Sequence, residues 1–309
     1  MATDPMVYLD GKLMPATQAH VSIYNMGVVL GVTVTDMTRT FRKQAYRLED
    51  HIRRFYESCK YAHLKPPISA EETVEVTREL IDHNAALLPP EGELGIIHFI
   101  TPGENQIYAG SAGKGQEMKP TYCIHSFPLP FFLFRKIVSE GVHLVVPSTR
   151  HVPPQCVDPK IKNRSRLHWW LADYETHLVD PDAMSWLLDL DGNLTESSGA
   201  NVLIVKDGTV LSPAPRNILL GISRKIVFEL CAKLAVPFVE RDLQLHDALT
   251  ADEIFLTTTP YCMAPVTRVN GMPIGDGKTG KPVFERILKA WSADVGVDIR
   301  GQFLNAAVA

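Results

Sequence analysis

The chain has 309 residues, of which 45% are hydrophobic and 21% charged, so it is long enough for one large or two medium domains, and we expect two. The formal net charge of −4 and the isoelectric point near 6.3 provide no basic field that would hold a phosphate backbone. These values argue against nucleic acid as a partner, and a small anionic substrate would need local positive charge.

The cysteine pattern and the apolar runs indicate the compartment. Five cysteines are scattered along the chain without CxxC or Cys/His spacing, which argues against a disulfide framework or structural zinc and fits a reducing cytosol. The N-terminus carries Asp4 early and lacks a long apolar core, so it does not resemble a signal peptide. The apolar run 127–134 contains two prolines and is far shorter than a bilayer span. We therefore expect a cytoplasmic protein without a membrane segment.

Residues 1–126 predict a smaller N-terminal α+β domain. Strand and turn signals surround Asp10-Gly11, and a β-rich stretch with alternating or continuous apolar residues follows. A helix is expected from Leu48, where apolar residues recur at helical spacing, and Pro66-Pro67 ends it. The expected strands cover 7–16, 21–41, 95–101 and 121–127, and the expected helices cover 48–64 and 70–88.

Residues 127–135 are the expected interdomain linker, because the repeated prolines in FPLPF stiffen a connection and remove backbone donors from any sheet. Residues 136–309 then form the larger C-terminal domain. Its expected strands lie at 142–148 and within 184–213, with turns at Asp191-Gly192 and Asp207-Gly208, and its expected helices cover 165–179, 223–234 and 282–291.

Lys162 and Glu196 suggest a particular chemistry only when their order along the chain, together with that of other residues, is considered. A lysine such as Lys162 is most often a solvated surface cation, and Glu196 in NLTESSGAN could be a turn carboxylate. Chemistry on a covalently bound pyridine cofactor, however, needs a nucleophilic amine, an acid that keeps the pyridine nitrogen protonated, and a phosphate cup. The sequence offers candidates for all three in a fixed order.

Four segments, taken in chain order, resemble the class IV aminotransferases, which include branched-chain and D-amino-acid aminotransferases and aminodeoxychorismate lyase. The segments are VDPKIKNRSRLHWWLADYE, DGNLTESSGANVLIVKDG, NILLGISRK and DEIFLTTTPYCMAPVTRVNG. The resemblance runs from about Val7 to Trp291. It implies an α+β, two-domain fold-type IV enzyme of the D-amino-acid aminotransferase-like architecture, with pyridoxal 5′-phosphate between the domains.

The resemblance also selects the lysine that carries the cofactor. Placing Lys162 on the family lysine brings Glu175 onto an acidic residue that many members carry later in the same helix, and it leaves the interval to Glu196 without an insertion. Lys160 would require one. Lys160, Arg164 and Arg166 could lower the pKa of Lys162 if they point inward, but we interpret them as a basic turn at the surface.

The remaining cofactor contacts are implied by the same resemblance. Glu196 pairs with the pyridine nitrogen, and Arg54 in HIRRFYESCKYA holds the phosphate with its planar guanidinium, whereas Arg53 is expected on the solvent face. Backbone N–H groups at a helix start suit an anion. The further cofactor-binding candidates are Leu219, Ile222, Ser223, Thr258 and Thr259.

Metal chemistry is not expected. The histidines, among them His125, His143, His151 and His168, show no metal-binding spacing, and each is interpreted as an ordinary core or surface histidine.

The substrate-binding residues of the known subfamilies do not carry over. Leu167 occupies the position of a tyrosine in branched-chain enzymes, Gly95 lies where those enzymes have a Tyr-x-Arg strand, and Thr35 occupies the position of the tyrosine in D-amino-acid enzymes. The sequence leaves the carboxylate-binding residue open. The candidates are Arg39, His98, Lys114 and backbone donors near Thr259, with Arg39 the first choice, and Thr35 is a further candidate residue of the substrate site.

The expected activity is transamination between an amino acid and a 2-oxo acid. Lys162 is expected to remove and return protons during the exchange. Branched-chain or other apolar L-amino acids are the favoured substrates, because Val, Ile and Met residues of the first domain could line an apolar site. A D-amino-acid aminotransferase, an aminodeoxychorismate lyase-type enzyme and a non-catalytic cofactor-binding protein remain alternatives. The resemblance further implies a homodimer.

Overall fold

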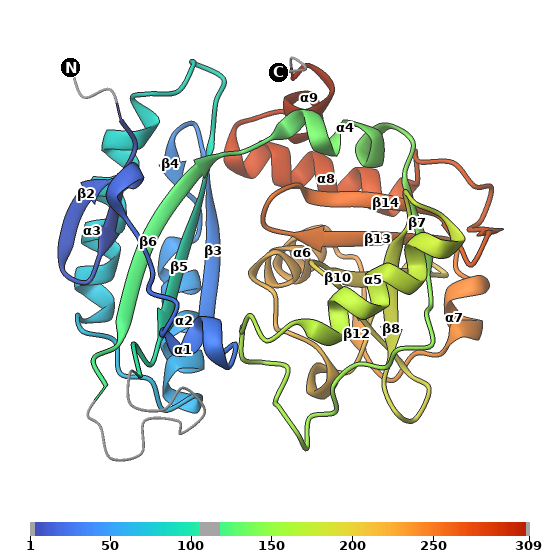
Figure 1. Cartoon of the computed structure of the whole chain (residues 1–309). Coiled ribbons are helices and arrows are strands. Elements are labelled where there is room, and N and C mark those ends of the chain that lie inside the picture. The colour runs from blue at the N-terminus through green and yellow to red at the C-terminus, as the bar shows by residue number, and fades with distance from the viewer. Residues whose placement is uncertain (1–3, 106–117, 307–309) are drawn as a thin grey trace. The chain divides into compact units, whose positions relative to one another are not determined.

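The computed structural model describes residues 4–105 and 118–306 and divides the chain into two compact units (Figure 1). The first unit contains Met1–Leu129 together with Ile161–Ser165, and the second contains Pro130–Lys160 and Arg166–Ala309. Both units combine β-sheets with helices, and this confirms the expected α+β class with two domains. No helix within the described ranges is long and apolar enough to cross a membrane.

The first unit is built on a six-stranded antiparallel sheet in the order β2-β1-β6-β5-β3-β4. Asp10 and Gly11 turn between the first two strands with positive φ angles of 50° and 91°, as a tight hairpin requires. The strands are β1 (Met6–Leu9), β2 (Lys12–Pro15), β3 (Val34–Phe41), β4 (Gln44–Ala45), β5 (Leu94–Thr101) and β6 (Thr121–Pro128). The helices are the 3₁₀ turn η1 (Ala16–Gln18), α1 (Met26–Val29), α2 (Leu48–Tyr61) and α3 (Ala70–Ala85).

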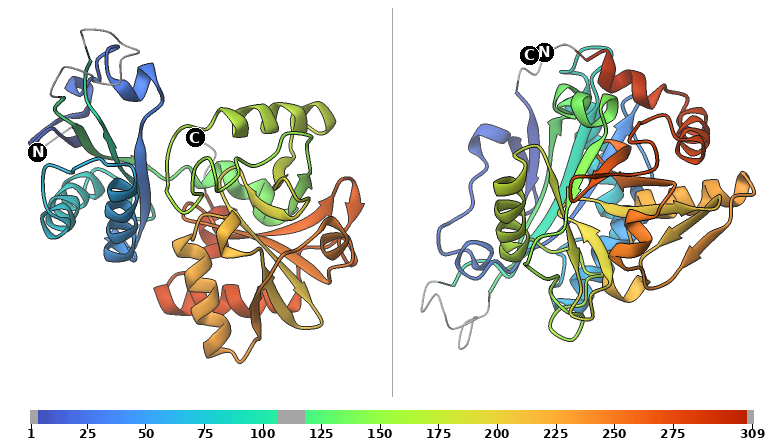
Figure 2. Two further views of the ribbon diagram at one scale, coloured as in Figure 1. Left: turned by 90° about the horizontal axis from the view of Figure 1, so that it is seen from below. Right: turned by 90° about the vertical axis from the view of Figure 1, so that its right-hand side faces the viewer.

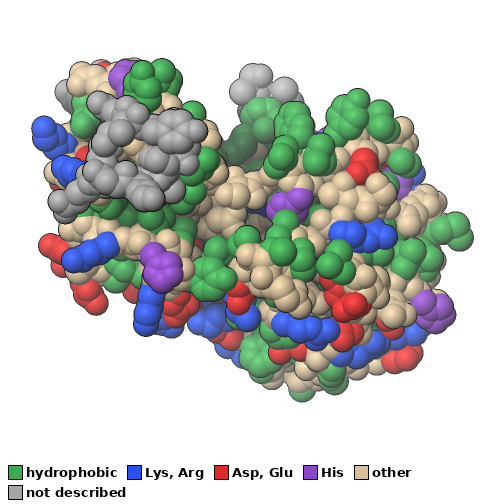
Figure 3. Space-filling view, turned by 60° about the horizontal axis from the view of Figure 1, so that its bottom comes forward, with side chains coloured by type: hydrophobic (Ala, Val, Ile, Leu, Met, Phe, Trp, Pro, Cys, Tyr) green, Lys and Arg blue, Asp and Glu red, His purple; other side chains and the backbone are tan. Residues whose placement is uncertain are grey.

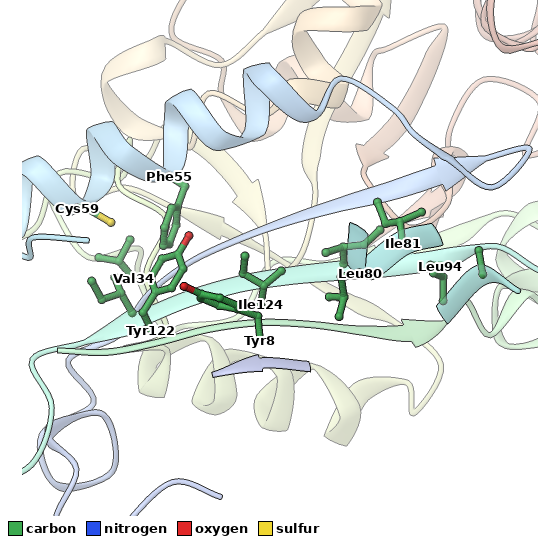
Figure 4. Close-up of a cluster of buried hydrophobic side chains, with 12 residues drawn as sticks. Tyr8, Val34, Phe55, Cys59, Leu80, Ile81, Leu94, Tyr122 and Ile124 are labelled. Carbon is green, nitrogen blue, oxygen red and sulfur yellow. The ribbon is translucent and has the colours of Figure 1, made fainter. Parts of the chain in front are cut away.

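Helices α2 and α3 pack their apolar residues against one face of this sheet. Phe55 of α2 meets Tyr122 of β6, with ring centroids 6.1 Å apart, and Tyr8 of β1 lies edge-on to Tyr122, also at 6.1 Å (Figure 4). The Tyr122 hydroxyl is 2.8 Å from Thr73 Oγ1 on α3, so its polar end is satisfied inside the core. The first core therefore lies between the sheet and these two helices.

The segment before β3 differs from the expected continuous β structure over 21–41. Asn25 caps the short helix α1 by accepting the Gly27 N–H at 2.9 Å, and Gly31 turns the chain with a φ angle of 69°. An asparagine side chain that bonds to nearby backbone groups competes with strand pairing. The strand consequently begins only at Val34.

The second unit contains a nine-stranded mixed sheet in the order β12-β11-β10-β13-β14-β7-β8-β9, with β15 paired to β14. Asp207-Gly208 and Asn270-Gly271 form turns with positive φ angles. The strands are β7 (Val142–Val145), β8 (Met184–Leu188), β9 (Leu194–Ser197), β10 (Asn201–Lys206), β11 (Thr209–Ser212), β12 (Phe238–Glu240), β13 (Glu253–Thr258), β14 (Cys262–Val269) and β15 (Met272–Pro273).

Helices cover both sides of this second sheet, with α6 and α8 together on one side and α5 on the other (Figure 2). The helices are α4 (Phe131–Ser139), α5 (Leu167–Val179), η2 (Pro215–Asn217), α6 (Ile222–Lys233), α7 (Leu245–Leu249), α8 (Pro282–Val295) and α9 (Ile299–Leu304). Helix α4 lies where part of the linker was expected. The linker prolines Pro128 and Pro130 lie before the first turn of α4, and Pro130 is its N-cap residue. A missing N–H at these positions costs no helical hydrogen bond.

We expect the core beneath α3 to be sensitive to truncation. Leu80→Ala, at a side chain that is 1% exposed, should lower the free energy of unfolding by about 2–5 kcal/mol because it removes buried contacts and leaves a cavity. Leu87→Ala, just after the same helix and 38% exposed, should cost no more than about 1 kcal/mol. Urea unfolding of both variants measures the difference, and equal losses would contradict this location of the core.

Candidate active site

The backbone around Lys162 is attached to the first unit by hydrogen bonds from two elements. The Thr35 N–H donates to the Lys162 carbonyl at 2.9 Å, and the Arg164 N–H donates to the Thr33 carbonyl at 2.9 Å. The Lys162 N–H in turn donates to Ser58 Oγ of α2 at 3.2 Å. The segment 161–165 therefore runs along β3 like a short extra strand, which fixes the point from which the Lys162 side chain leaves the chain.

Lys160 has different surroundings. It is exposed, belongs to the second unit, and its Nζ atom lies 3.5 Å from Asp158. A cation with such a partner at the surface behaves as an ordinary solvated lysine. Of the two lysines, Lys162 is the one whose backbone is anchored on a sheet and a helix.

Arg54 is held in place by a buried carboxylate. Arg54 Nε donates to Asp36 Oδ2 at 2.8 Å and a terminal nitrogen donates to Oδ1 at 2.9 Å, so the pair is bidentate. The His51 Nδ1 atom is 2.7 Å from the same Oδ1. Asp36 is fully buried; both of these side-chain partners come from α2, and the Met37 N–H of β3 also donates to Oδ1 at 2.8 Å. Thus β3 carries the carboxylate that orients Arg54.

The charges in this cluster follow from its burial. Burial alone would raise the pKa of Asp36, but the Arg54 guanidinium and the His51 hydrogen bond outweigh it and hold the pKa well below the ordinary 3.8. Burial lowers the pKa of His51, and the positive charges of Arg54 and Lys162 lower it further against the pull of Asp36. At neutral pH the cluster therefore contains a charged Arg54–Asp36 pair and a neutral His51 that donates through Nδ1.

The substrate candidates do not all lie on the same face of the sheet. Side chains alternate along a strand, so Thr35 and Arg39 of β3 lie on the face opposite to Asp36 and its helix α2. The Arg39 guanidinium stacks 4.0 Å from the centre of the Phe41 ring, and its Nε donates to the Thr40 carbonyl at 3.1 Å. Thr35 and Arg39 are thus brought to one face.

His98 lies on the other face, inside the core. It is fully buried, its Nε2 atom is 2.9 Å from Thr77 Oγ1 on α3, and burial lowers its pKa to about 3. A neutral imidazole enclosed beneath a helix is poorly placed to bind a substrate carboxylate, so we leave His98 out. Arg39 is also buried, at 2% exposed, but it has a charged guanidinium and lies with Thr35 on the face that α2 and α3 do not cover, so we keep both. Lys114 lies outside the described residues.

In the second unit, Asn201 connects the residues expected to bind the cofactor. Its Nδ2 atom donates to Glu196 Oε2 at 3.1 Å and to the Leu219 carbonyl at 2.9 Å. The Leu219 N–H also donates to Glu196 Oε2, at 3.1 Å. A Cβ atom on Gly221 would come within 2.2 Å of Asn201 Oδ1, so only glycine allows this close approach. Glu196 at β9 is therefore tied to the chain just before α6.

The start of α6 presents backbone donors without a side-chain cap. Gly221 is the N-cap residue and makes no side-chain hydrogen bond, and Ile222 and Ser223 are the first helical residues. The first N–H groups of a helix have no partner within the helix and favour an anion. Ile222 and Ser223 are both buried side chains, so it is their N–H groups, rather than exposed side chains, that are suited to a phosphate.

Thr258 ends the neighbouring strand β13 beside the same region. Asn201 pairs with Thr257 across the sheet, and Thr258 Oγ1 donates to the Gly199 carbonyl at 2.6 Å. Thr259 follows and is half-buried. The structure thus brings together Glu196, Leu219, Ile222, Ser223 and Thr258 around Asn201, a residue that the sequence motif contained but did not single out.

Two further residues at Glu196 were not expected. His151 is buried, as a core histidine would be, but its Nε2 atom lies 3.5 Å from Glu196 Oε1, a neighbour that the sequence did not indicate. Arg166 was expected at the surface, but it is half-buried, a terminal nitrogen donates to the Ser198 carbonyl, and its guanidinium lies 5.8 Å from the Trp169 ring centre. These contacts join residues far apart in the chain, so they are visible only in the folded structure, where His151 lies beside β8 and β9 and Arg166 lies beside Ser198.

Each unit by itself fits one part of pyridoxal phosphate. The first unit holds an anchored lysine and an arginine fork fixed by Asp36. The second unit holds the Glu196 carboxylate, one oxygen of which accepts two N–H groups. It also holds the start of α6, where Gly221 leaves no room for a Cβ atom. These groups match a carbonyl carbon, a phosphate and a protonated pyridine nitrogen.

Asp36→Asn should destabilise the protein and disturb Arg54. Removing the charge leaves a guanidinium that is mostly buried facing a neutral amide, and we expect a loss of about 3 kcal/mol in the free energy of unfolding at neutral pH. Because the pKa of Asp36 is lowered in the folded protein, this contribution is complete above 3.8 and is lost as the pH falls below it.

Asp50→Asn is the matched control for this change. Asp50 lies in the first turn of α2 and contacts Arg47 and Arg53 at 3.5 Å. The Asp50 side chain is 13% exposed, but those of Arg47 and Arg53 are 32% and 67% exposed, and ion pairs that reach the surface contribute less than about 1 kcal/mol. Chemical unfolding at pH 7 and in acid measures both variants. Comparable losses for the two would show that Asp36 has no special structural role.

The sequence is similar to proteins of one known family. Residues 33–269 match the model of the family described as amino-transferase class IV. A Methanocaldococcus jannaschii protein assigned by name to the branched-chain-amino-acid aminotransferases is 29% identical over 295 residues, which cover 94% of this chain and 98% of that protein. A D-alanine aminotransferase of Listeria monocytogenes is 27% identical over 285 residues, which cover 89% of this chain and 91% of that protein.

The same fold occurs in a solved structure. The crystal structure of the branched-chain aminotransferase from the thermophilic archaeon Thermoproteus uzoniensis with norvaline superimposes with a TM-score of 0.82 at 24% identity, over 97% of each chain. The family model covers most of the sequence, from Thr33 in front of β3 to the end of β14. The chain therefore belongs to the class IV aminotransferase family, a family of pyridoxal-phosphate enzymes.

Proposed function

We propose that this protein is an aminotransferase that uses pyridoxal phosphate to exchange an amino group between an apolar amino acid and a 2-oxo acid. The observation that carries the proposal is the anchored backbone of Lys162, which β3 and Ser58 of α2 hold in the same unit as the Arg54–Asp36 pair. A lysine that must bond a cofactor and then move protons needs such a fixed origin.

Each protein group has a separate task in this proposal. Lys162 bonds the cofactor covalently and moves a proton at the α-carbon of the substrate, and Arg54 binds the phosphate. Glu196 pairs with the pyridine nitrogen, and the N–H groups of Ile222 and Ser223 bind phosphate oxygens. When bound, pyridoxal phosphate supplies an electron sink for negative charge at the substrate α-carbon.

Asp36 and Asn201 orient the groups that touch the cofactor. Asp36 keeps the guanidinium fork of Arg54 in one geometry through two hydrogen bonds. Asn201 fixes Glu196 and Leu219 by donating to both. Residues that lock the conformation of a binding group reduce the entropy lost when the ligand binds. We further propose that Thr258 and Thr259 complete the phosphate site.

The substrate side of the proposal rests on one face of the first sheet. On this face, Thr35 and Arg39 accompany Met37, and the paired strand β5 contributes Ile97 and Phe99. Met37, Ile97 and Phe99 are half-buried, which suits an apolar side chain, while Arg39 is the proposed partner of the carboxylate. The names of the similar proteins include both branched-chain and D-alanine aminotransferases, so a D-amino acid is the second candidate.

The lysine assignment is tested with two matched variants. We expect wild-type protein and Lys160→Ala to show the visible absorbance of bound pyridoxal phosphate and to lose it on addition of amino acids, because both retain the anchored Lys162. Lys162→Ala should lose the covalent absorbance and at least about 10³-fold in rate, since both bond formation and proton movement need this amine. Absorbance spectra and single-turnover rates measure this.

A panel of L- and D-amino acids with 2-oxo acid acceptors identifies the reaction. Apolar L-amino acids should give the highest kcat/KM. Preference for D-amino acids would replace the substrate assignment while leaving the family chemistry intact. Release of pyruvate without a 2-oxo acid acceptor would indicate a lyase instead. Absence of any cofactor absorbance in wild type after addition of pyridoxal phosphate would overturn the proposed function.

We also propose that the protein is a cytoplasmic homodimer. All five cysteines, which lie within the described ranges, are free, as suits a reducing compartment. Helix α5 exposes an apolar stripe at helical spacing, in which Trp170 is 72% and Leu178 73% exposed. The stripe consists of Leu167, Trp170, Leu171, Tyr174 and Leu178. In Figure 3 hydrophobic side chains stand out along the upper edge of the second unit, where α5 lies.

A second copy of the chain is the occupant that best fits this stripe. Contiguous apolar patches on monomers rarely exceed about 300–600 Å², and two large aromatic and three leucine side chains would reach that size. None of the five stripe residues carries a charge, so the stripe can pack against its own copy across a twofold axis.

Leu178→Arg should weaken this proposed interface. A charge in the stripe would have to be buried without a partner, and we expect the apparent dimer dissociation constant to rise by at least about 100-fold. Leu133→Arg on α4 is the control, because Leu133 is also a strongly exposed leucine but lies outside the stripe. Light scattering across a dilution series measures both. A monomeric wild type, or an unchanged dimer in the Leu178 variant, would refute this interface.

A further inference from the structure

His151 is held rigidly beside Glu196. Its backbone N–H donates to the Leu188 carbonyl at 2.9 Å, and its Nδ1 atom is 2.9 Å from the Val152 carbonyl. The ring packs edge-on against Trp169, with centroids 5.5 Å apart. Two and three residues before it, Thr149 and Ser148 donate hydrogen bonds to Glu175 of α5, two of them, each 2.7 Å long, from Ser148. The imidazole therefore has a fixed direction.

The Val152 carbonyl fixes the tautomer of this ring. A carbonyl oxygen only accepts, so Nδ1 must carry a hydrogen. The Nε2 atom of a neutral ring is then an acceptor, yet it faces Glu196 Oε1 at 3.5 Å. Two acceptors facing each other repel, whereas a proton on Nε2 turns the contact into a charged pair. The geometry thus favours the protonated form of His151 beside an ionised Glu196.

The other oxygen of Glu196 is occupied by neutral donors. Oε2 accepts from Asn201 Nδ2 and from the Leu219 N–H, both at 3.1 Å. A carboxylate offers about four lone-pair sites, so one lone pair on Oε1 remains beside the one facing His151. A protonated pyridine nitrogen that docks on Glu196 would therefore place a second cation next to His151.

The charges around His151 come from two elements, β9 and α5. Glu196 lies on β9, Arg166 caps α5, and His168 lies in the first turn of α5 with its ring centre 5.7 Å from that of His151. Burial, His151 and Arg166 lower the pKa of His168 to about 4, so His168 is neutral at physiological pH. Asp173 further down α5 acts on Arg166. Arg166 keeps its charge at any physiological pH.

These charges make His151 the group that can respond. Burial lowers the pKa of His151, but the Glu196 carboxylate and the Val152 carbonyl raise it more, and the net shift from 6.5 is upward even though Arg166 opposes it. A pyridinium on Glu196 would add a third cation to His151 and Arg166 around one carboxylate. Loss of a proton from His151 would reduce the repulsion among these cations, because Arg166 does not titrate in this pH range.

We propose that in the cofactor-free protein His151 carries a proton on Nε2, facing Glu196, and that docking of a protonated pyridine nitrogen on Glu196 releases this proton from His151 Nε2 to the solvent. No bond between heavy atoms forms or breaks in this step. His151 is a positioning residue that acts through Glu196. The inference rests on the proposed function, because it takes Glu196 as the partner of the pyridine nitrogen.

The first test uses the cofactor-free protein and is independent of ligand binding. Nuclear magnetic resonance titration of the histidine side chains should give His151 a pKa above 6.5 in wild type, and Glu196→Gln should lower it because the carboxylate is removed. His168→Gln should leave the titration of His151 near its wild-type position. A wild-type value at or below 6.5, or no shift in Glu196→Gln, would overturn the placement of this proton on His151 Nε2.

The second test counts protons on binding of pyridoxamine 5′-phosphate, which carries the same pyridine and phosphate but cannot bond Lys162 through an aldehyde. Calorimetric titration at pH 6.5 in buffers of different ionisation enthalpy gives the number of protons released. Wild type should release about 0.5–1 proton more than His151→Gln, and its affinity should fall by up to about tenfold for each pH unit below the pKa of His151, a dependence that the variant lacks.

His168→Gln provides the matched control in this test, because a histidine that is already neutral has no proton to lose. It should release the same number of protons as wild type. Equal proton release by wild type and His151→Gln would overturn the coupling while leaving the proposed function standing. Failure of wild type to bind pyridoxamine 5′-phosphate would overturn the proposed function, and the coupling with it. Far-ultraviolet circular dichroism confirms that each variant is folded.

Discussion

The buried ion pair between Asp36 and Arg54 is the constraint on which the first unit's site depends. Burying a carboxylate without a partner would cost several kcal/mol, so Asp36 needs both the bidentate guanidinium and His51. The requirement draws α2 onto β3. At the start of the same strand, backbone groups of Thr33 and Thr35 hold the chain on either side of Lys162. One stretch of chain therefore positions the amine and the phosphate-binding guanidinium by separate hydrogen bonds.

In the second unit, a short polar side chain has the corresponding role. Asn201 has one amide that donates to Glu196 and to the Leu219 carbonyl, while its oxygen lies so close to Gly221 that only a glycine fits. The start of α6 is thereby fixed relative to β9 and β10. Helices have unpaired N–H groups wherever they begin, and this contact decides that α6 begins beside the carboxylate.

The two carboxylates differ in the cations that face them. Asp36 is paired with Arg54, which stays charged across the physiological pH range, and the pair forms a permanent structural element. Glu196 faces His151, a group whose charge can change near neutral pH, and accepts neutral N–H groups on its other oxygen. A permanent pair suits the positioning of a phosphate-binding arginine. A titratable pair suits a carboxylate that must exchange one cationic partner for another.

The sequence by itself determined the elements with strong periodicity and the order of the chemical residues. Apolar spacing predicted α2, α3, α6 and α8, and turn residues predicted the hairpins at Asp10-Gly11 and Asp207-Gly208, because these signals are local. The ordered motifs identified the family. Two local expectations were wrong, because the Asn25 cap replaced the first part of the expected strand 21–41 with α1, and α4 formed after the prolines of the expected linker. Tertiary structure decided the rest. Burial of Arg166, and the approach of His151 and Asn201 to Glu196, depend on contacts between residues far apart in the chain, and neither spacing nor propensity carries information about such contacts.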